Sequence, residues 1–321
     1  MSWFTYGAAA ALPPMLLLWY VHSRDKDPEP RGLLWRTFFW GAALCPPVIL
    51  VTACVHGLAV RWGWHLQTWN TALLLAFLGI ALPEQCARLL VLRLFVWNKP
   101  AFDEPLDGVV YGATVSLGFA MMENLFYVLA TSEQAGPGLA ALRAFTSVPQ
   151  QAFTGIILGA FVGRARFDED RARGTRRLAS GLAAATLLQG AYGTILLGPL
   201  PFIPLTLLVI VLEVRWGRRL YKALQAEQLS TNPSVTDAPP ASLPLAFPLS
   251  AKLRLHVGGA GLWCCAIAWV ILLALLFGEP RPWDADTKER NTFSASVVFV
   301  STIISLIVYR SGKRDLAWTG P

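Results

Sequence analysis

The chain has few charged residues, and this shortage narrows its class. Of its 321 residues only 15% are charged and 55% are hydrophobic, whereas about 25% of the residues in a typical soluble domain are charged. The mean hydropathy is +0.48. Several apolar runs reach about 18 residues or more, the length that a helix needs to cross a bilayer. The sequence therefore predicts an all-α, polytopic membrane helix bundle embedded in lipid.

Common metal-binding and redox motifs are also missing. No cysteine pair is spaced as C-x-x-C, and no H-E-x-x-H motif is present. The five cysteines lie in apolar runs, where we expect them to be small buried hydrophobic side chains. The four histidines lie at span ends or in loops. The net charge of +7 comes without a nucleic-acid-binding motif, so no nucleic-acid partner is expected.

The basic residues predict the orientation of the spans. With the N-terminus outside, the inner loops hold 20 of the 27 Lys and Arg residues and the outer segments hold five. Because cytoplasmic loops collect positive charge, we expect an outside N-terminus and a cytoplasmic C-terminus. Short loops suit a bacterial cytoplasmic membrane, an expectation that rests mainly on a resemblance to a known family. The nine predicted spans are about residues 4–21, 37–59, 71–96, 108–130, 144–163, 178–196, 200–214, 258–277 and 292–309.

A change in composition divides the chain. Residues 224–250 are rich in Ser, Pro, Ala and Thr and contain few charges, which is typical of a flexible linker. We therefore predict a transmembrane bundle of about seven spans over residues 1–222. A cytoplasmic linker over 223–257 and a C-terminal pair of spans over 258–321 follow it.

Polar residues lie inside the predicted spans. A charged side chain at mid-bilayer depth costs roughly 2.5 kcal/mol or more, so such residues usually mark a site or a structural pair. With a rise of about 1.5 Å per residue, their positions fall in one slab of the membrane. Four consecutive helices can therefore direct polar groups toward one pocket. These residues are Glu84, Gln85 and Arg88 in the third span, Glu123 and Asn124 in the fourth, Gln151 in the fifth and Gln189 in the sixth.

Each of these residues also has a structural interpretation. Glu84 is either a general base or metal ligand, or the partner of Arg88 four residues later. Glu123 with Asn124 suits a functional site or hydrogen bonding between helices. For Gln151 and Gln189, hydrogen bonding between helices is the favoured interpretation.

Two further segments have structural interpretations. The glycines at 155, 159 and 163 permit close helix packing, either inside the bundle or in a homo-oligomer. The acidic segment 102–108 is typical of a helix start, with a Ca²⁺ or Mg²⁺ site as the alternative.

Across these positions the chain resembles the PrsW family of intramembrane metalloproteases, which are distantly similar to CAAX-type proteases. The resemblance runs from about residue 14 to 215. Several motifs occur in order on successive spans, which makes the resemblance fairly specific. They are RDKDPEP at 24–30, FDEPLDG at 102–108, GFA at 118–120, ENLFY at 123–127, SVP at 147–149 and LLQGAY at 187–192.

The resemblance implies a zinc site built from a Glu-Glu pair, a basic residue, a Glu-Asn motif and histidines on two later spans. Glu84, Arg88, Glu123 and Asn124 match this pattern. Four other positions depart from it: Gln85 replaces the second Glu, Gln151 and Gln189 replace the histidines, and Gly193 replaces an acidic residue. Zinc is bound by imidazole, thiolate or carboxylate. Only Glu84 and Glu123 then remain as metal ligands, and two carboxylates suit Mg²⁺ or Mn²⁺ better.

Three hypotheses follow. The first is a family member with impaired or lost metal-dependent peptidase activity that binds transmembrane segments of partner proteins. The second is an active intramembrane metalloendopeptidase in which Glu84 and Glu123 are the catalytic residues. The third is a proton-coupled transporter or a structural membrane protein, because intramembrane Glu and Arg side chains can relay protons.

Overall fold

The computed structural model describes residues 3–23, 29–64, 68–130, 136–199 and 202–230. Over these ranges the chain contains helices and no strand, which confirms the all-α class. The predicted spans at 258–277 and 292–309 lie outside the described residues. The elements are α1 (Trp3–Ser23), α2 (Arg31–Arg61), α3 (Trp69–Leu74), η1 (Leu75–Ala81), α4 (Leu82–Val91), η2 (Leu92–Val96), α5 (Asp107–Ala130), α6 (Gly136–Phe145), α7 (Ser147–Arg166), α8 (Arg171–Leu197) and α9 (Ile203–Ser230).

Among the described residues, five helical stretches are long and apolar enough to cross a membrane. They coincide with the second to sixth predicted spans and are Arg31–Arg61, Trp69–Val96, Asp107–Tyr127, Ala141–Arg166 and Arg171–Leu197. The chain is therefore a multi-pass membrane protein. α1 and α9 are helices at the first and seventh predicted spans.

α9 is longer than the sequence predicted. The seventh span was expected at 200–214 and a linker from 223, but the helix continues to Ser230. Its second half is anchored to the bundle, because Leu220 and Leu224 are buried in a cluster with Ile157 and Ala160 of α7. Packing of an apolar face stabilises this second half, which composition alone did not identify as helical.

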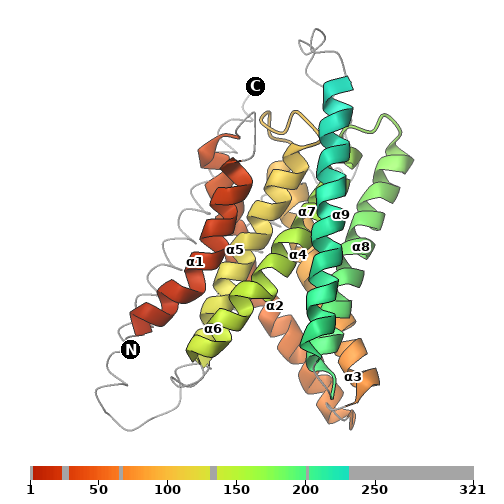
Figure 1. Ribbon diagram of the computed structural model, residues 1–321. Helices are drawn as coiled ribbons and strands as arrows, with labels where there is room; N and C mark the ends of the chain where they lie inside the picture. The colour runs from red at the N-terminus through yellow and green to blue at the C-terminus, as the bar shows by residue number, and fades with distance from the viewer. Residues whose placement is uncertain (1–2, 24–28, 65–67, 131–135, 200–201, 231–321) are drawn as a thin grey trace, which may run out of the picture.

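α5 is the central helix of the bundle. Of the five stretches it is the most buried, since 83% of the residues in an apolar 18-residue window of this helix are buried. It packs against α7, α2 and α1. In Figure 1 successive connections between the long helices lie at opposite ends of the bundle. The α4–α5 and α7–α8 connections lie at the same end as the C-terminus of α9, and the α2–α3 connection and α6 lie at the other. The Arg-rich α7–α8 connection is thus grouped with the other predicted inner segments.

Glycines bring α5 and α7 into close contact. A Cβ on Gly112 would lie 2.3 Å from the Gly155 carbonyl oxygen, and one on Gly159 would lie 2.0 Å from the Gly108 carbonyl oxygen. Both distances are far below van der Waals contact, so no side chain fits there. The glycine run at 155, 159 and 163 therefore packs against α5 of the same chain, which agrees with the bundle interpretation.

The third predicted span is helical throughout but irregular. α3, η1, α4 and η2 follow one another over residues 69–96, and the two η segments are π-helical. The Leu82 N–H bonds the Phe77 carbonyl, five residues back, and Pro83 follows. Because proline has no N–H, the regular ladder is interrupted here. α4 begins directly after this wide turn and carries Glu84 into the core.

The prediction that the cysteines are buried was wrong for two of those that the structure describes. Cys45 is buried, but Cys54 and Cys86 are exposed on the outer surface of the bundle. An apolar run that crosses a membrane need not be buried in protein, because lipid covers its outward face. Apolarity therefore predicted the environment of these thiols without predicting their protein contacts.

Candidate functional site

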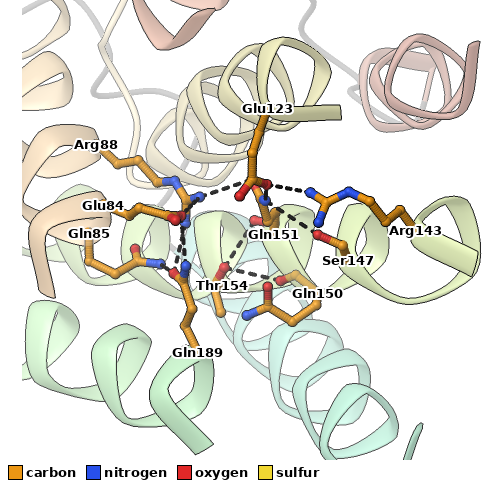
Figure 2. A network of polar contacts seen from close by, with 10 residues as sticks. All are labelled: Glu84, Gln85, Arg88, Glu123, Arg143, Ser147, Gln150, Gln151, Thr154 and Gln189. Atoms are coloured by element: carbon orange, nitrogen blue, oxygen red, sulfur yellow. Dashed lines mark hydrogen bonds and ion pairs between the residues drawn. The ribbon is translucent and has the colours of Figure 1, made fainter. Parts of the chain in front are cut away.

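The polar residues singled out in the spans lie together in the bundle. Figure 2 draws all of them but Asn124, and shows them pointing toward one another from α4, α5, α7 and α8, with Arg143 reaching in from α6. Most of these side chains are almost completely inaccessible: Glu84 is 4% exposed, Gln85 0%, Arg88 1% and Gln151 2%. The pooling of polar groups predicted for four consecutive helices is therefore present in the structure.

Arg88 connects three helices. Its Nη2 donates to Glu84 Oε2 at 2.9 Å and to Gln151 Oε1 at 3.0 Å, and its Nη1 donates to Gln189 Oε1 at 3.2 Å. The guanidinium also lies 5.0 Å from the centre of the Phe119 ring on α5. A planar fork of donors suits this task, since one cation can hold several oxygens at once. The pair with Arg88 is one of the two interpretations of Glu84 that its spacing left open, and the structure contains that pair.

Gln189 closes the network on the α8 side. Its Nε2 donates to Glu84 Oε2 at 2.7 Å, while its Oε1 accepts from Gln85 Nε2 at 2.5 Å. An amide carries both donors and an acceptor, so Gln189 can bond a carboxylate and another amide together. A metal-bound imidazole at this position has no acceptor atom left and could not accept from Gln85 while donating to Glu84. Gln189 therefore has a complete structural role as an amide.

Glu123 forms the second half of the network, toward α6. Its Oε2 accepts from Gln151 Nε2 and from Arg143 Nη2, each at 2.5 Å. Asn124 Oδ1 accepts from Arg143 Nε at 2.7 Å, and the guanidinium lies 4.0 Å from the centre of the Tyr127 ring. Glu123 is 13% exposed, so this end of the cluster is more accessible than the Glu84 end.

Arg143 is the site residue that sequence reasoning missed. It was assigned to an outer loop over 131–143, but residues 136–145 form α6 and turn its guanidinium into the cluster. One signal was available, because two carboxylates and one arginine leave the predicted slab with an unbalanced negative charge. A second basic residue near a span end was the natural partner for Glu123.

The residues present do not fit a zinc ion. Among the described residues, no group of three or more His, Cys, Asp and Glu side chains lies close enough to hold a metal. One oxygen of each carboxylate already accepts two hydrogen bonds, and the Arg88 cation bonds both Glu84 and Gln151. Glutamine amides are neutral and poor ligands for zinc. Of the described histidines, His22 bonds Thr114 on α5, and His56 is in α2.

The acidic segment 102–108 starts α5, as the sequence predicted. Asp107 Oδ2 accepts hydrogen bonds from the backbone N–H groups of Asp103 and Glu104, each at 2.9 Å. Nearby, the Tyr111 hydroxyl donates to Glu29, which is buried. These contacts tie the segment before α2 to the start of α5, which gives the acidic residues a structural role.

Comparison with known proteins agrees with the resemblance seen in the sequence. A family model described as "PrsW family intramembrane metalloprotease" matches residues 29–215. A Bacillus subtilis protein named "Protease PrsW" is 34% identical over 196 residues, which cover 60% of this chain and 83% of that protein. The Oceanobacillus iheyensis protein of the same name is 30% identical over 222 residues, covering 69% and 95%. No solved structure matches significantly.

Proposed function

The chain belongs to the PrsW family of intramembrane metalloproteases, and on this premise we propose that it has impaired or lost metal-dependent peptidase activity. In this proposal it keeps the family's intramembrane scaffold and binds transmembrane segments of partner proteins without cutting them. It crosses the membrane nine times, with its N-terminus outside and its C-terminus cytoplasmic. Residues up to about 230 form the bundle, and the last two spans follow a linker. We place it in a bacterial cytoplasmic membrane.

One observation supports the loss of activity above the others. Neutral amides stand where the resemblance implies histidines, and both bond the carboxylates. Gln151 Nε2 donates to Glu123 and Gln189 Nε2 donates to Glu84, so each candidate metal ligand is held by an amide N–H where a zinc site needs imidazole. Gln85 adds no basicity, because an amide cannot accept a proton as a general base must. Protein groups hold the network together, while Gln85 Oε1 and Arg88 Nε are buried without a hydrogen-bond partner among the described residues, and no step of peptide hydrolysis follows from it.

The proposed partner is a transmembrane segment of another protein, and the cluster has an end that such a segment can contact. Glu123 and Arg143 form the more accessible end of the cluster, and Tyr127 beside them is 45% exposed. An unwound or polar transmembrane segment can bond these groups where a wholly apolar helix cannot. Binding at this end would keep the Glu84 end dry.

A cleavage assay tests the loss of activity. The full chain is co-expressed with a membrane-anchored reporter, with the Bacillus subtilis relative as the comparison enzyme. We expect no more reporter cleavage than with the Glu84→Ala/Glu123→Ala double variant. Cleavage by the wild-type chain that disappears in both single variants would instead establish the active endopeptidase that uses Glu84 and Glu123. This alternative is favoured by the observation that Glu84 and Glu123 belong to one hydrogen-bonded network.

Photo-crosslinking tests the binding. A photoreactive residue in place of Tyr127 is expected to capture the reporter's transmembrane segment. The same residue in place of Val51, 48% exposed on α2, serves as the matched control because it is similarly exposed and lies on another helix. Equal capture from both positions would contradict binding at the cluster.

A further inference from the structure

Another buried carboxylate, that of Glu213, lies outside the hydrogen-bonded cluster. Glu213 on α9 is 0% exposed, and it faces Gln150 of α7, which is 1% exposed. Neither carboxylate oxygen of Glu213 has a hydrogen-bond partner, and neither does Gln150 Nε2. Glu84, by contrast, is held by Arg88 and Gln189. Two buried glutamates in one bundle thus have opposite surroundings.

The side chain of Gln150 is directed away from the candidate site. Gln150 and Gln151 are neighbours on α7, and the Thr154 hydroxyl donates to both of their backbone carbonyls at 3.0 Å. In Figure 2 the Gln151 side chain lies among Arg88, Glu123 and Ser147, whereas the Gln150 side chain points away from them. Glu213 and Gln150 therefore form a separate polar pair, independent of the function proposed above.

The groups around Glu213 offer it no counter-ion. α9 packs against α7 and α8. The titratable and charged groups that act on Glu213 are Tyr192 of α8 and Arg88 of α4. Both Nη atoms of Arg88 already bond other side chains, and its buried Nε has no hydrogen-bond partner in the described part of the chain, so it does not bond Glu213 either. Among the described residues no ion pair includes Glu213.

These surroundings favour the neutral form of the acid. Burying an ionised carboxylate without a partner is strongly unfavourable, while a neutral acid is far cheaper to bury. A neutral acid also keeps a carbonyl oxygen that can accept from Gln150 Nε2. Intramembrane carboxylates that lack an ion pair are typical of proton-binding positions.

We propose that Glu213 and Gln150 form a proton-binding site inside the bundle. Glu213 holds a proton as a neutral carboxylic acid at neutral pH and releases it in alkaline surroundings. On release the carboxyl O–H bond breaks, the electron pair stays on oxygen, and the proton leaves to water. The ligand of this site is the proton, and Gln150 is its positioning residue.

Infrared spectroscopy of the full chain in lipid bilayers tests the proposal. A protonated carboxyl group has its own carbonyl stretch, separate from the bands of a carboxylate. At neutral pH we expect this band to weaken in Glu213→Gln by the amount of one carboxyl group. It should remain unchanged in Glu227→Gln, the matched control on the same helix, because Glu227 is exposed and ion-paired with Arg164. Raising the pH should weaken the band of the wild-type chain by the same amount, while the spectrum of Glu213→Gln should not change in this way.

Thermal unfolding of the same variants provides a second test that does not depend on resolving the carboxyl band. Glutamine is isosteric with the neutral acid, so Glu213→Gln should unfold at the same temperature as the wild type or higher at neutral pH. In alkaline buffer the wild type should become the less stable of the two, because it alone gains a buried unpartnered charge. An unchanged carboxyl band in Glu213→Gln, or a wild type that stays more stable than this variant at alkaline pH, would overturn the proposal.

Discussion

Arg88 and Glu84 form an ion pair one helical turn apart in the core of the bundle. Nη2 lies 2.9 Å from Oε2, and the side chains are 1% and 5% exposed. Such a pair is balanced only as long as both partners are present, because each charge has left water at a large cost. The pair therefore couples the packing of α4 to the chemistry of the candidate site.

Removal of Arg88 is expected to destabilise the bundle strongly. The Arg88→Met variant leaves the buried Glu84 carboxylate uncompensated, which typically costs about 3–5 kcal/mol. Chemical unfolding of the purified protein in detergent micelles measures this loss. The Glu84→Gln/Arg88→Met double variant is the control, and it should recover part of the stability because it buries no charge. An Arg88→Met variant as stable as the wild type would contradict the role of this pair.

Arg143 is expected to hold α6 against the bundle. Arg143→Gln removes the ion pair with Glu123 and the bond to Asn124, and a charged hydrogen bond of this kind contributes about 1.5–3 kcal/mol. Limited proteolysis should then cut the region around α6 faster than in the wild type. Arg176→Gln is the matched control, since Arg176 is exposed and its Nε donates to the Ala172 carbonyl of its own helix. Equal cleavage rates in both variants would refute this assignment.

Gly159 is expected to tolerate no side chain. Gly159→Ala would place a Cβ 2.0 Å from the Gly108 carbonyl oxygen, so α5 and α7 must separate and the melting temperature should fall. In Gly57→Ala the new Cβ meets nothing within 4 Å. That control should be neutral or stabilised by up to about 1 kcal/mol, because alanine favours helix more than glycine does. Similar melting temperatures in the two variants would contradict the close packing of α5 on α7.

Asp170 gives α8 a pH-dependent start. The backbone N–H groups of Ala172 and Arg173 hold the pKa of this exposed carboxylate below its ordinary value of 3.8, and the Ala172 bond is 2.8 Å long. A lowered pKa stabilises the folded state above the ordinary value, and this stabilisation is lost as the pH falls through the lowered pKa. Asp170→Ala should therefore be less stable than the wild type at neutral pH, and the difference should disappear in acid.

The control for this pH dependence is Glu169→Ala, which changes the neighbouring exposed acid. Its stability should follow that of the wild type across the whole pH range. A deficit of Asp170→Ala that persists unchanged in acid would show that the side chain stabilises α8 through something other than its charge.

Much of the candidate site could be predicted from the sequence, because the membrane makes polar residues conspicuous. The spacing of Glu84 and Arg88 fixed a shared helix face, and helix rise placed Gln151 and Gln189 at similar depth. What the spacing could not supply is the choice of bonds. Gln189 donates to Glu84 and accepts from Gln85, and an amide side chain has no pattern in sequence that specifies its partners.

The residues that were missed have a common physical cause. Arg143 was counted with an outer loop because the ten-residue helix α6 is too short to show as an apolar run. Glu213 lies at the end of the run at 200–214, where a carboxylate usually reaches the membrane surface. It is buried instead because α9 continues beyond it to Ser230. Both residues depend on contacts between helices far apart in the chain.

The zinc content of the purified full chain tests the central claim most directly. The chain is purified in buffer supplemented with zinc, and bound metal is measured by elemental mass spectrometry. The Gln85→Glu/Gln151→His/Gln189→His variant restores carboxylate and imidazole ligands and is expected to bind zinc, as the positive control. Our account predicts that the wild-type chain holds far less than one zinc ion per molecule. Near-stoichiometric zinc in the wild-type chain would contradict it.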